Sequence, residues 1–188
     1  LSAQERLTSP SAGRPRPEAP AVSTFARDKL REAREWLDTG DPAGMAGDLL
    51  SAALTDSPGF VEAAATSYGL TGVMPERTVQ VLWGHGEALL ELARRIRALP
   101  RPTPAPPSEA PRPADHRGPA AAPITEDHRA LLRRLLDRAV ALDVAEARFE
   151  RGLLRSEDND REGGLFDLRA YVASEPQAPG LDEAHNIL

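Results

Sequence analysis

The distribution of proline constrains this chain more than any other feature of its sequence. Nine of the 18 prolines lie in residues 100–123. Proline lacks a backbone N–H and disfavours a helix in the residue before it, so this stretch predicts a linker of polyproline II character. Residues 1–23 hold four more prolines and few apolar side chains, which predicts a flexible arm. Two folded parts are therefore expected, over 24–99 and 124–173, with a flexible tail over 174–188.

The first folded part has the spacing and turn signals of four helices. Apolar residues recur every three or four positions, as one face of an α-helix requires. Ser57-Pro58 is typical of a helix start and Gly69 of a helix end. Gly84 and Gly86 lie inside the fourth helix, where each glycine costs about 1 kcal/mol relative to alanine, so we expect a kink or break there. The predicted helices cover 24–39, 42–55, 58–68 and 75–98.

A second apolar pattern follows the linker, and its spacing alternates between four and three residues. It predicts one long amphipathic helix over 124–155 with a coiled-coil-like seam. A short helix over 165–173 is expected to fold back and leave much of this seam uncovered. A partner helix or a second copy of the chain would then cover it, and docking onto the first folded part is the alternative. The predicted partner-binding residues are Leu132, Leu135, Leu142, Phe149 and Leu153.

Composition excludes several classes of function. The chain contains no Cys, which excludes disulfide scaffolds, thiol catalysis and cysteine-based metal sites. Its net charge is −6 and acidic residues outnumber basic ones in both folded parts, so binding of nucleic acid is not expected. No apolar run approaches the ~20 residues of a membrane span. We expect a cytoplasmic protein that is not an enzyme, uses no cofactor and contacts no membrane.

Residues 61–83 resemble a helix-turn-helix DNA-binding unit. Such a unit needs a small residue where its two helices touch, and Ala65 has that place here. Arg77 and Gln80 would face the major groove in this interpretation. The stretch between the two helices is longer than the usual turn, and the surrounding part is acidic. Two consecutive bundle helices joined by a loop are therefore the favoured interpretation.

The sequence D-N-D-R-E-G over residues 158–163 resembles the opening of an EF-hand calcium loop. Acidic oxygens fall at alternate positions and glycine is sixth, as such a loop requires. The twelfth position normally supplies a bidentate glutamate, and Arg169 stands there. We therefore expect an ordinary acidic turn with no metal ion, with weak calcium binding as the alternative.

The sequence thus predicts an all-α protein with a small four-helix domain, a proline-rich linker, and a long amphipathic helix with a short return helix. The predicted function is a non-catalytic interaction subunit, such as an adaptor, assembly factor or regulatory factor. It would bind a protein partner, or itself, by burying the seam, since each buried apolar side chain contributes about 1.5–3 kcal/mol. A helix-turn-helix regulator that uses residues 61–83 is the alternative function.

Overall fold

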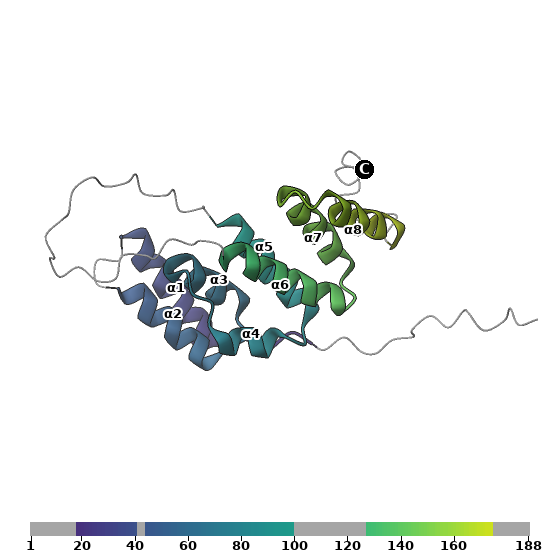
Figure 1. The fold of residues 1–188 in the computed structure, drawn as a ribbon. Helices are drawn as coiled ribbons and strands as arrows, with labels where there is room; N and C mark the ends of the chain where they lie inside the picture. Colours follow the sequence, from purple (N-terminus) through teal and green to yellow (C-terminus); the bar gives the residue numbers. More distant parts are fainter. Residues whose placement is uncertain (1–17, 41–43, 100–126, 175–188) are drawn as a thin grey trace, which may run out of the picture.

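The computed structural model of this chain is helical throughout the residues it describes, which are 18–40, 44–99 and 127–174 (Figure 1). Eight α-helices and no strand lie within those ranges, so the expected all-α class is confirmed. The helices are α1 (Thr24–Asp38), α2 (Met45–Asp56), α3 (Val61–Thr71), α4 (Glu76–Leu82), α5 (Gly86–Ala98), α6 (Asp127–Ala141), α7 (Ala145–Glu157) and α8 (Arg161–Ser174).

Several predicted segments lie outside the described residues. These are the linker over 100–123, residues 1–17 of the arm predicted over 1–23, and the tail beyond residue 174. The end of the arm is not flexible as predicted, because Val22 packs against the core and Ser23 caps α1. The predicted start of the second helix at residue 42 also lies outside them.

The helices pack mainly on their neighbours in the sequence. α1 packs on α2, α2 on α3, α3 on α5, α5 on α6, α6 on α7 and α7 on α8. α4 is the exception, because it makes few contacts with any helix. Figure 1 shows the result, with α1 and α2 towards one end of the molecule and α7 and α8 towards the other.

One apolar core runs from α1 to α7. Leu30 of α1, Leu50 of α2, Tyr68 of α3, Leu89 of α5 and Leu135 of α6 are all buried in it. The helices on either side of residues 100–126 therefore share a core, and α5 and α6 pack directly together. A smaller cluster joins α7 to α8.

The first part of the chain contains five helices where four were predicted, because the helix expected over 75–98 is two. The break falls where the glycines lie, and the N–H of His85 donates to the carbonyl of Leu82 at 2.8 Å as α4 ends. Gly86 then begins α5 against the α6–α7 connection. A Cβ on Gly86 would lie 2.6 Å from Cγ2 of Val144, so only glycine permits this approach.

The prediction that Gly69 ends the third helix is wrong. α3 continues to Thr71 and ends at Gly72, which has a φ of 71°. Gly69 instead makes room for a neighbour, since a Cβ there would lie 3.2 Å from Cδ2 of Leu99.

The prediction of one long helix over 124–155 is also wrong. α6 ends at Ala141 and α7 begins at Ala145. Asp143 has a φ of 59°. Its N–H donates to the carbonyl of Val140 at 3.0 Å, and the N–H of Val144 donates to that of Ala139 at 3.2 Å. This pair of bonds is the Schellman motif that ends many helices, usually with glycine where Asp143 stands.

The return helix is longer than predicted. α8 begins at Arg161 and not at residue 165, because Asp160 caps it. The N–H of Gly163 donates to Oδ1 of Asp160 at 3.0 Å, which is the usual arrangement of an N-cap.

Candidate functional site

The structure covers the predicted seam with the chain itself. Leu132 and Leu135 are 3% and 0% exposed in the core that α6 shares with α5. Leu142 is half-buried beside Gly86, while Phe149 and Leu153 pack in the α7–α8 cluster. The expectation of an uncovered seam is wrong, because the break after Ala141 turns α7 away and α5 covers the first half. A partner could reach Leu132, Leu135 and Phe149 only by separating helices, whereas Leu142 and Leu153 are partly exposed.

A different side of α6 is open. It borders a shallow hollow, open to solvent, that Trp83 also lines. A second hollow, of about 380 Å³, lies between α6 and the α3–α4 connection. Ala130 and Arg134 line both, so the two hollows adjoin, and we call them together the α6 groove. Its other lining residues are Arg133, Asp137, Arg138 and Ala141 in the first hollow and Tyr68, Gly72, Val73, Met74 and Leu131 in the second.

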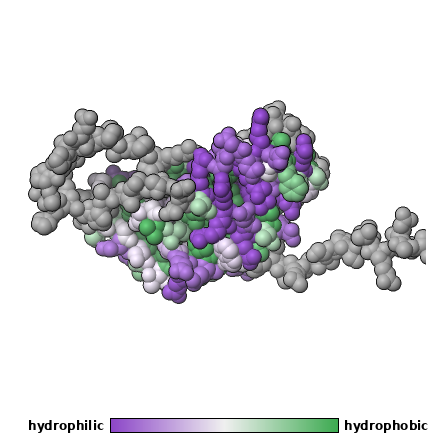
Figure 2. Space-filling model, viewed as in Figure 1, coloured by the Kyte–Doolittle hydropathy of each residue, from purple (hydrophilic) through white to green (hydrophobic). Residues whose placement is uncertain are grey.

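Figure 2 shows a band of strongly hydrophilic side chains beside hydrophobic patches on the face of the molecule that carries α6. Val73 is 67% exposed and Trp83 37% exposed, so the groove offers apolar area as well as charge.

Arg138 fixes Trp83 at the edge of the groove. The Nε of Arg138 donates to the carbonyl of Trp83 at 2.8 Å, and its guanidinium carbon lies 5.3 Å from the centre of the indole ring. This distance is within the range of a cation–π interaction, which is worth about 0.5–1 kcal/mol at an exposed site. The ring therefore has a defined position although its surface is open to solvent.

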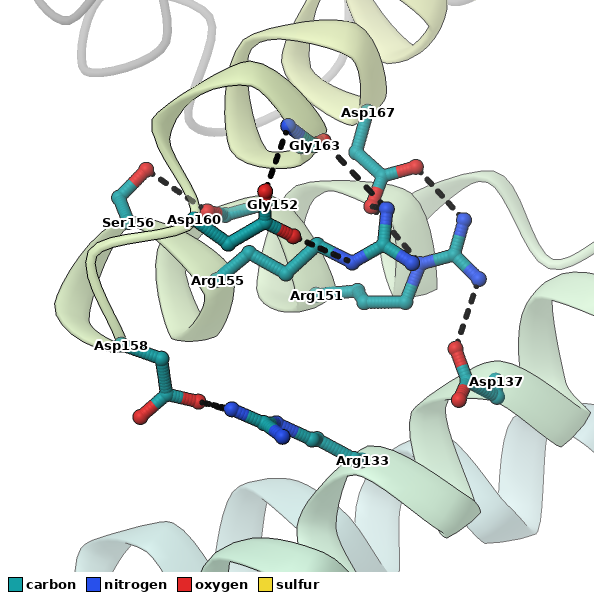
Figure 3. Close-up of polar contacts among 10 residues, drawn as sticks. All are labelled: Arg133, Asp137, Arg151, Gly152, Arg155, Ser156, Asp158, Asp160, Gly163 and Asp167. Carbon is teal, nitrogen blue, oxygen red and sulfur yellow. Dashed lines mark hydrogen bonds and ion pairs between the residues drawn. The ribbon is translucent and has the colours of Figure 1, made fainter.

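Two other arginines of α6 share one carboxylate from the α7–α8 turn. Arg133 binds Asp158 with its Nη2 at 2.6 Å (Figure 3). Arg129 forms a second ion pair with the same carboxylate. Burial raises the pKa of Asp158, but the hydrogen bond and charge of Arg133, with the charge of Arg129, outweigh this effect. The pKa of Asp158 therefore lies below its ordinary value of 3.8.

A second ion-pair network ties α6, α7 and α8 together. The carboxylate of Asp167 is 1% exposed and accepts two bonds from Arg151, at 2.6 and 2.8 Å. Arg155 lies 3.1 Å from the same carboxylate, and Arg151 also reaches Asp137 of α6 at 2.8 Å (Figure 3). The hydrogen bonds that Arg151 donates to Asp167 are the main cause that raises the pKa of Arg151, against the opposing effect of burial. This network fixes Asp137 at the rim of the groove.

Arg134 differs from these residues because it forms no ion pair or hydrogen bond with any residue that the structure describes. Arg138, one helical turn further on, reaches no carboxylate within the same ranges. The groove therefore holds two guanidinium groups whose charge no described acid neutralises.

The helix-turn-helix candidates are not arranged as that unit requires. Arg77 and Gln80 are exposed on α4, where Gln80 donates to Glu76 at 3.2 Å. α3 packs on α2 and α5 and makes little contact with α4, which is only seven residues long. A DNA-binding unit instead packs its two helices against each other, with a recognition helix long enough to enter the major groove.

The calcium-loop candidates are engaged in other contacts. Asp158 binds arginines and Asp160 caps α8, so their oxygens do not converge. Among the described residues, no group of three or more histidine or acidic side chains could hold a metal ion. This stretch is a capped turn between α7 and α8, and Arg169 is exposed on α8.

The chain matches no known family. No family model, no curated protein and no solved structure is similar to it. None of the described helices is both long enough and apolar enough to span a bilayer. The geometry of the α6 groove is therefore the basis for the function proposed below.

Sequence reasoning missed this groove. Trp83 has the helical spacing of an inward residue, and the excess of arginine over lysine gives no reason to single out Arg134 or Arg138. The usable signal was the position of Trp83, directly before Gly84-His85-Gly86, because a bulky residue at a helix end is free to point outward.

Proposed function

We propose that this protein is a non-catalytic helical protein-binding module, of the adaptor, assembly or regulatory kind, and that its partner lies in the α6 groove. The observation that carries this proposal is the exposed Trp83 held by Arg138 beside the uncompensated Arg134. Tryptophan and arginine are the residue types that most often dominate protein interfaces. An aromatic ring already held in place loses little freedom when a partner covers it.

The chemistry of the groove supports binding over catalysis. Arg134 and Arg138 offer hydrogen-bond donors and no acceptor, which suits the binding of an anion better than acid–base catalysis. Asp137 lines the groove, but Arg151 already engages it at 2.8 Å. What the groove offers to a ligand is hydrogen-bond donors, positive charge and apolar area.

A photo-cross-linking residue at Val73 of the full chain tests the proposal in the cells that make the protein. The matched control is the same residue at Phe166 of α8, since these positions are 67% and 71% exposed. We expect a protein adduct from position 73 alone, and we expect Trp83→Ala to abolish it without loss of helical circular dichroism. Absence of an adduct, or the same adduct from both positions, would reject the groove as the binding surface.

DNA binding through Arg77 and Gln80 is the competing function. It requires retention on duplex DNA that weakens as salt rises, since phosphate contacts release counterions. Arg77→Ala would reduce that retention. We expect no retention at physiological salt, and retention that depends on Arg77 would favour the competing function.

A further inference from the structure

We infer that the partner segment in the α6 groove is an acidic helix, with carboxylates three or four residues apart facing Arg134 and Arg138 and an apolar side chain against Trp83. This inference rests on the proposed function and adds the chemistry of the partner.

The arginines of α6 differ in whether they form an ion pair. The carboxylate of Asp158 pairs with both Arg129 and Arg133, whereas Arg134 and Arg138 reach no carboxylate in the described ranges. The chain as a whole carries a net charge of −6, so this part of α6 is locally opposite in sign to the molecule. Arginine binds carboxylates in a two-bond geometry that gives both strength and direction. We therefore expect the partner to supply two carboxylates, one for Arg134 and one for Arg138.

The spacing of Arg134 and Arg138 on α6 matches that of two acidic residues on a partner helix. Arg134 and Arg138 are four residues apart on α6, which places them about 6 Å apart along its axis. Acidic residues three or four positions apart on a partner helix have the same separation. The 15 residues of α6 extend about 22 Å, so a partner helix of three to four turns fits the groove.

The shape of the groove also suits a helix. Ala130 and Ala141 line it with small side chains, which let another backbone approach closely. Val73, Met74 and Trp83 supply apolar surface along the same groove. An amphipathic helix that lays its apolar stripe into such a groove uses a recurrent mode of peptide recognition.

The same observations favour a peptide over a nucleic acid. A phosphate backbone carries negative charge along its whole length, and Asp137 lines the groove beside Arg134 and Arg138. A peptide can place its carboxylates at Arg134 and Arg138 alone and present apolar groups elsewhere.

A displayed library of random 16-residue peptides, selected on the immobilised full chain, tests this inference. We expect the enriched peptides to carry Asp or Glu pairs three or four residues apart beside Leu, Ile or Phe. The best peptide is then titrated by fluorescence of Trp83 in a Trp36→Phe background, where Trp83 is the sole tryptophan. Affinity should fall at least tenfold with Arg134→Gln/Arg138→Gln.

The matched control is Arg161→Gln/Arg169→Gln, which removes the same charge from exposed arginines of α8 and should leave affinity within twofold. The glutamine twin of the acidic peptide should bind at least tenfold more weakly. Enriched peptides without acidic pairs, equal binding of the twin, or equal loss in both double variants would overturn the inference. A 20-base-pair duplex that binds in place of the peptide, with the same dependence on Arg134 and Arg138, would overturn it in favour of nucleic acid.

These outcomes are separable from those of the cross-linking experiment. A groove-specific adduct without acidic enrichment rejects the acidic helix and leaves the protein-binding proposal standing. Absence of both a groove-specific adduct and acidic enrichment rejects both.

Discussion

At the scale of single residues, Asp167 has the most deeply buried carboxylate among the ion pairs of the described residues. Its carboxylate is 1% exposed, and it faces Arg151 and Arg155, which are 15% and 30% exposed. Removing one partner of a buried pair leaves the other charge desolvated without compensation. Loss of this ion pair would therefore destabilise the α7–α8 hairpin, because a buried charge would remain without a partner.

We expect Asp167→Ala to lower the free energy of unfolding by about 3–5 kcal/mol, measured by urea denaturation at pH 7. The control is Glu91→Ala, whose ion pair with Arg95 is exposed and should be worth less than about 1 kcal/mol. Equal effects of the two substitutions would show that Asp167 is not a critical partner.

Asp158 makes stability depend on pH in the acid range. Its folded-state pKa is lowered below 3.8, so the folded state favours the charged form. The stabilisation is fully present above the ordinary value and is lost as the pH falls through the lowered folded-state pKa. We expect Asp158→Asn to destabilise the protein at pH 7, and the difference from wild type to shrink as urea denaturation is repeated towards pH 2. A difference that is constant with pH would contradict this assignment.

At the scale of helices, the end of α6 shows what the sequence could not reveal. Gly84 and Gly86 predicted the break between α4 and α5, because glycine has special backbone preferences. No such residue marks the end of α6, where Asp143 adopts a φ of 59°. Aspartate tolerates this conformation at a cost, so the break depends on packing of α6 and α7 that a local pattern does not contain.

Replacing Asp143 with glycine should therefore stabilise the protein by about 1 kcal/mol, since a left-handed residue with a side chain costs about 1–2 kcal/mol. The side chain of Asp143 is 96% exposed and reaches Arg148 only at 4.0 Å, so little is lost with it. A thermal melt should show a higher midpoint for Asp143→Gly and a lower one for Asp143→Val. A lower midpoint for the glycine variant would contradict the strain.

Glycine has a different role where α7 crosses α8. A Cβ on Gly164 would lie 2.9 Å from the carbonyl oxygen of Gly152, which is closer than real contacts allow. We expect Gly164→Ala to push the helices apart and to cost about 1–3 kcal/mol in thermal denaturation. Gly84→Ala is the control, because its Cβ would meet no atom within 4 Å and should change stability little.

At the scale of the whole molecule, the sequence predicted an all-α chain but placed the apolar surface of α6 wrongly. The spacing correctly predicted that Leu132 and Leu135 lie on the apolar face of one helix. What covers them is α5, which no spacing within residues 124–155 could reveal. The α6 groove was missed for a related reason, since Trp83 and Arg134 come from separate segments and meet only through that packing.

The shared core predicts a single unfolding transition. Both tryptophans lie in the first part of the chain, whereas circular dichroism reports all helices. Because α5 and α6 bury each other's leucines, the two probes should give the same midpoint in urea. Two separate midpoints would show that the helices on either side of residues 100–126 unfold independently.

The packing of α5 against α6 also changes what the segment between them does. The helices before and after it belong to one core, so residues 100–126 join two parts of a single body and do not set the distance between two bodies. The entropy of closing a flexible loop rises by only about 0.6 kcal/mol for each doubling of its length. A doubling of the number of residues between Leu99 and Asp127 should thus lower the free energy of unfolding by less than about 1 kcal/mol, which urea denaturation would measure.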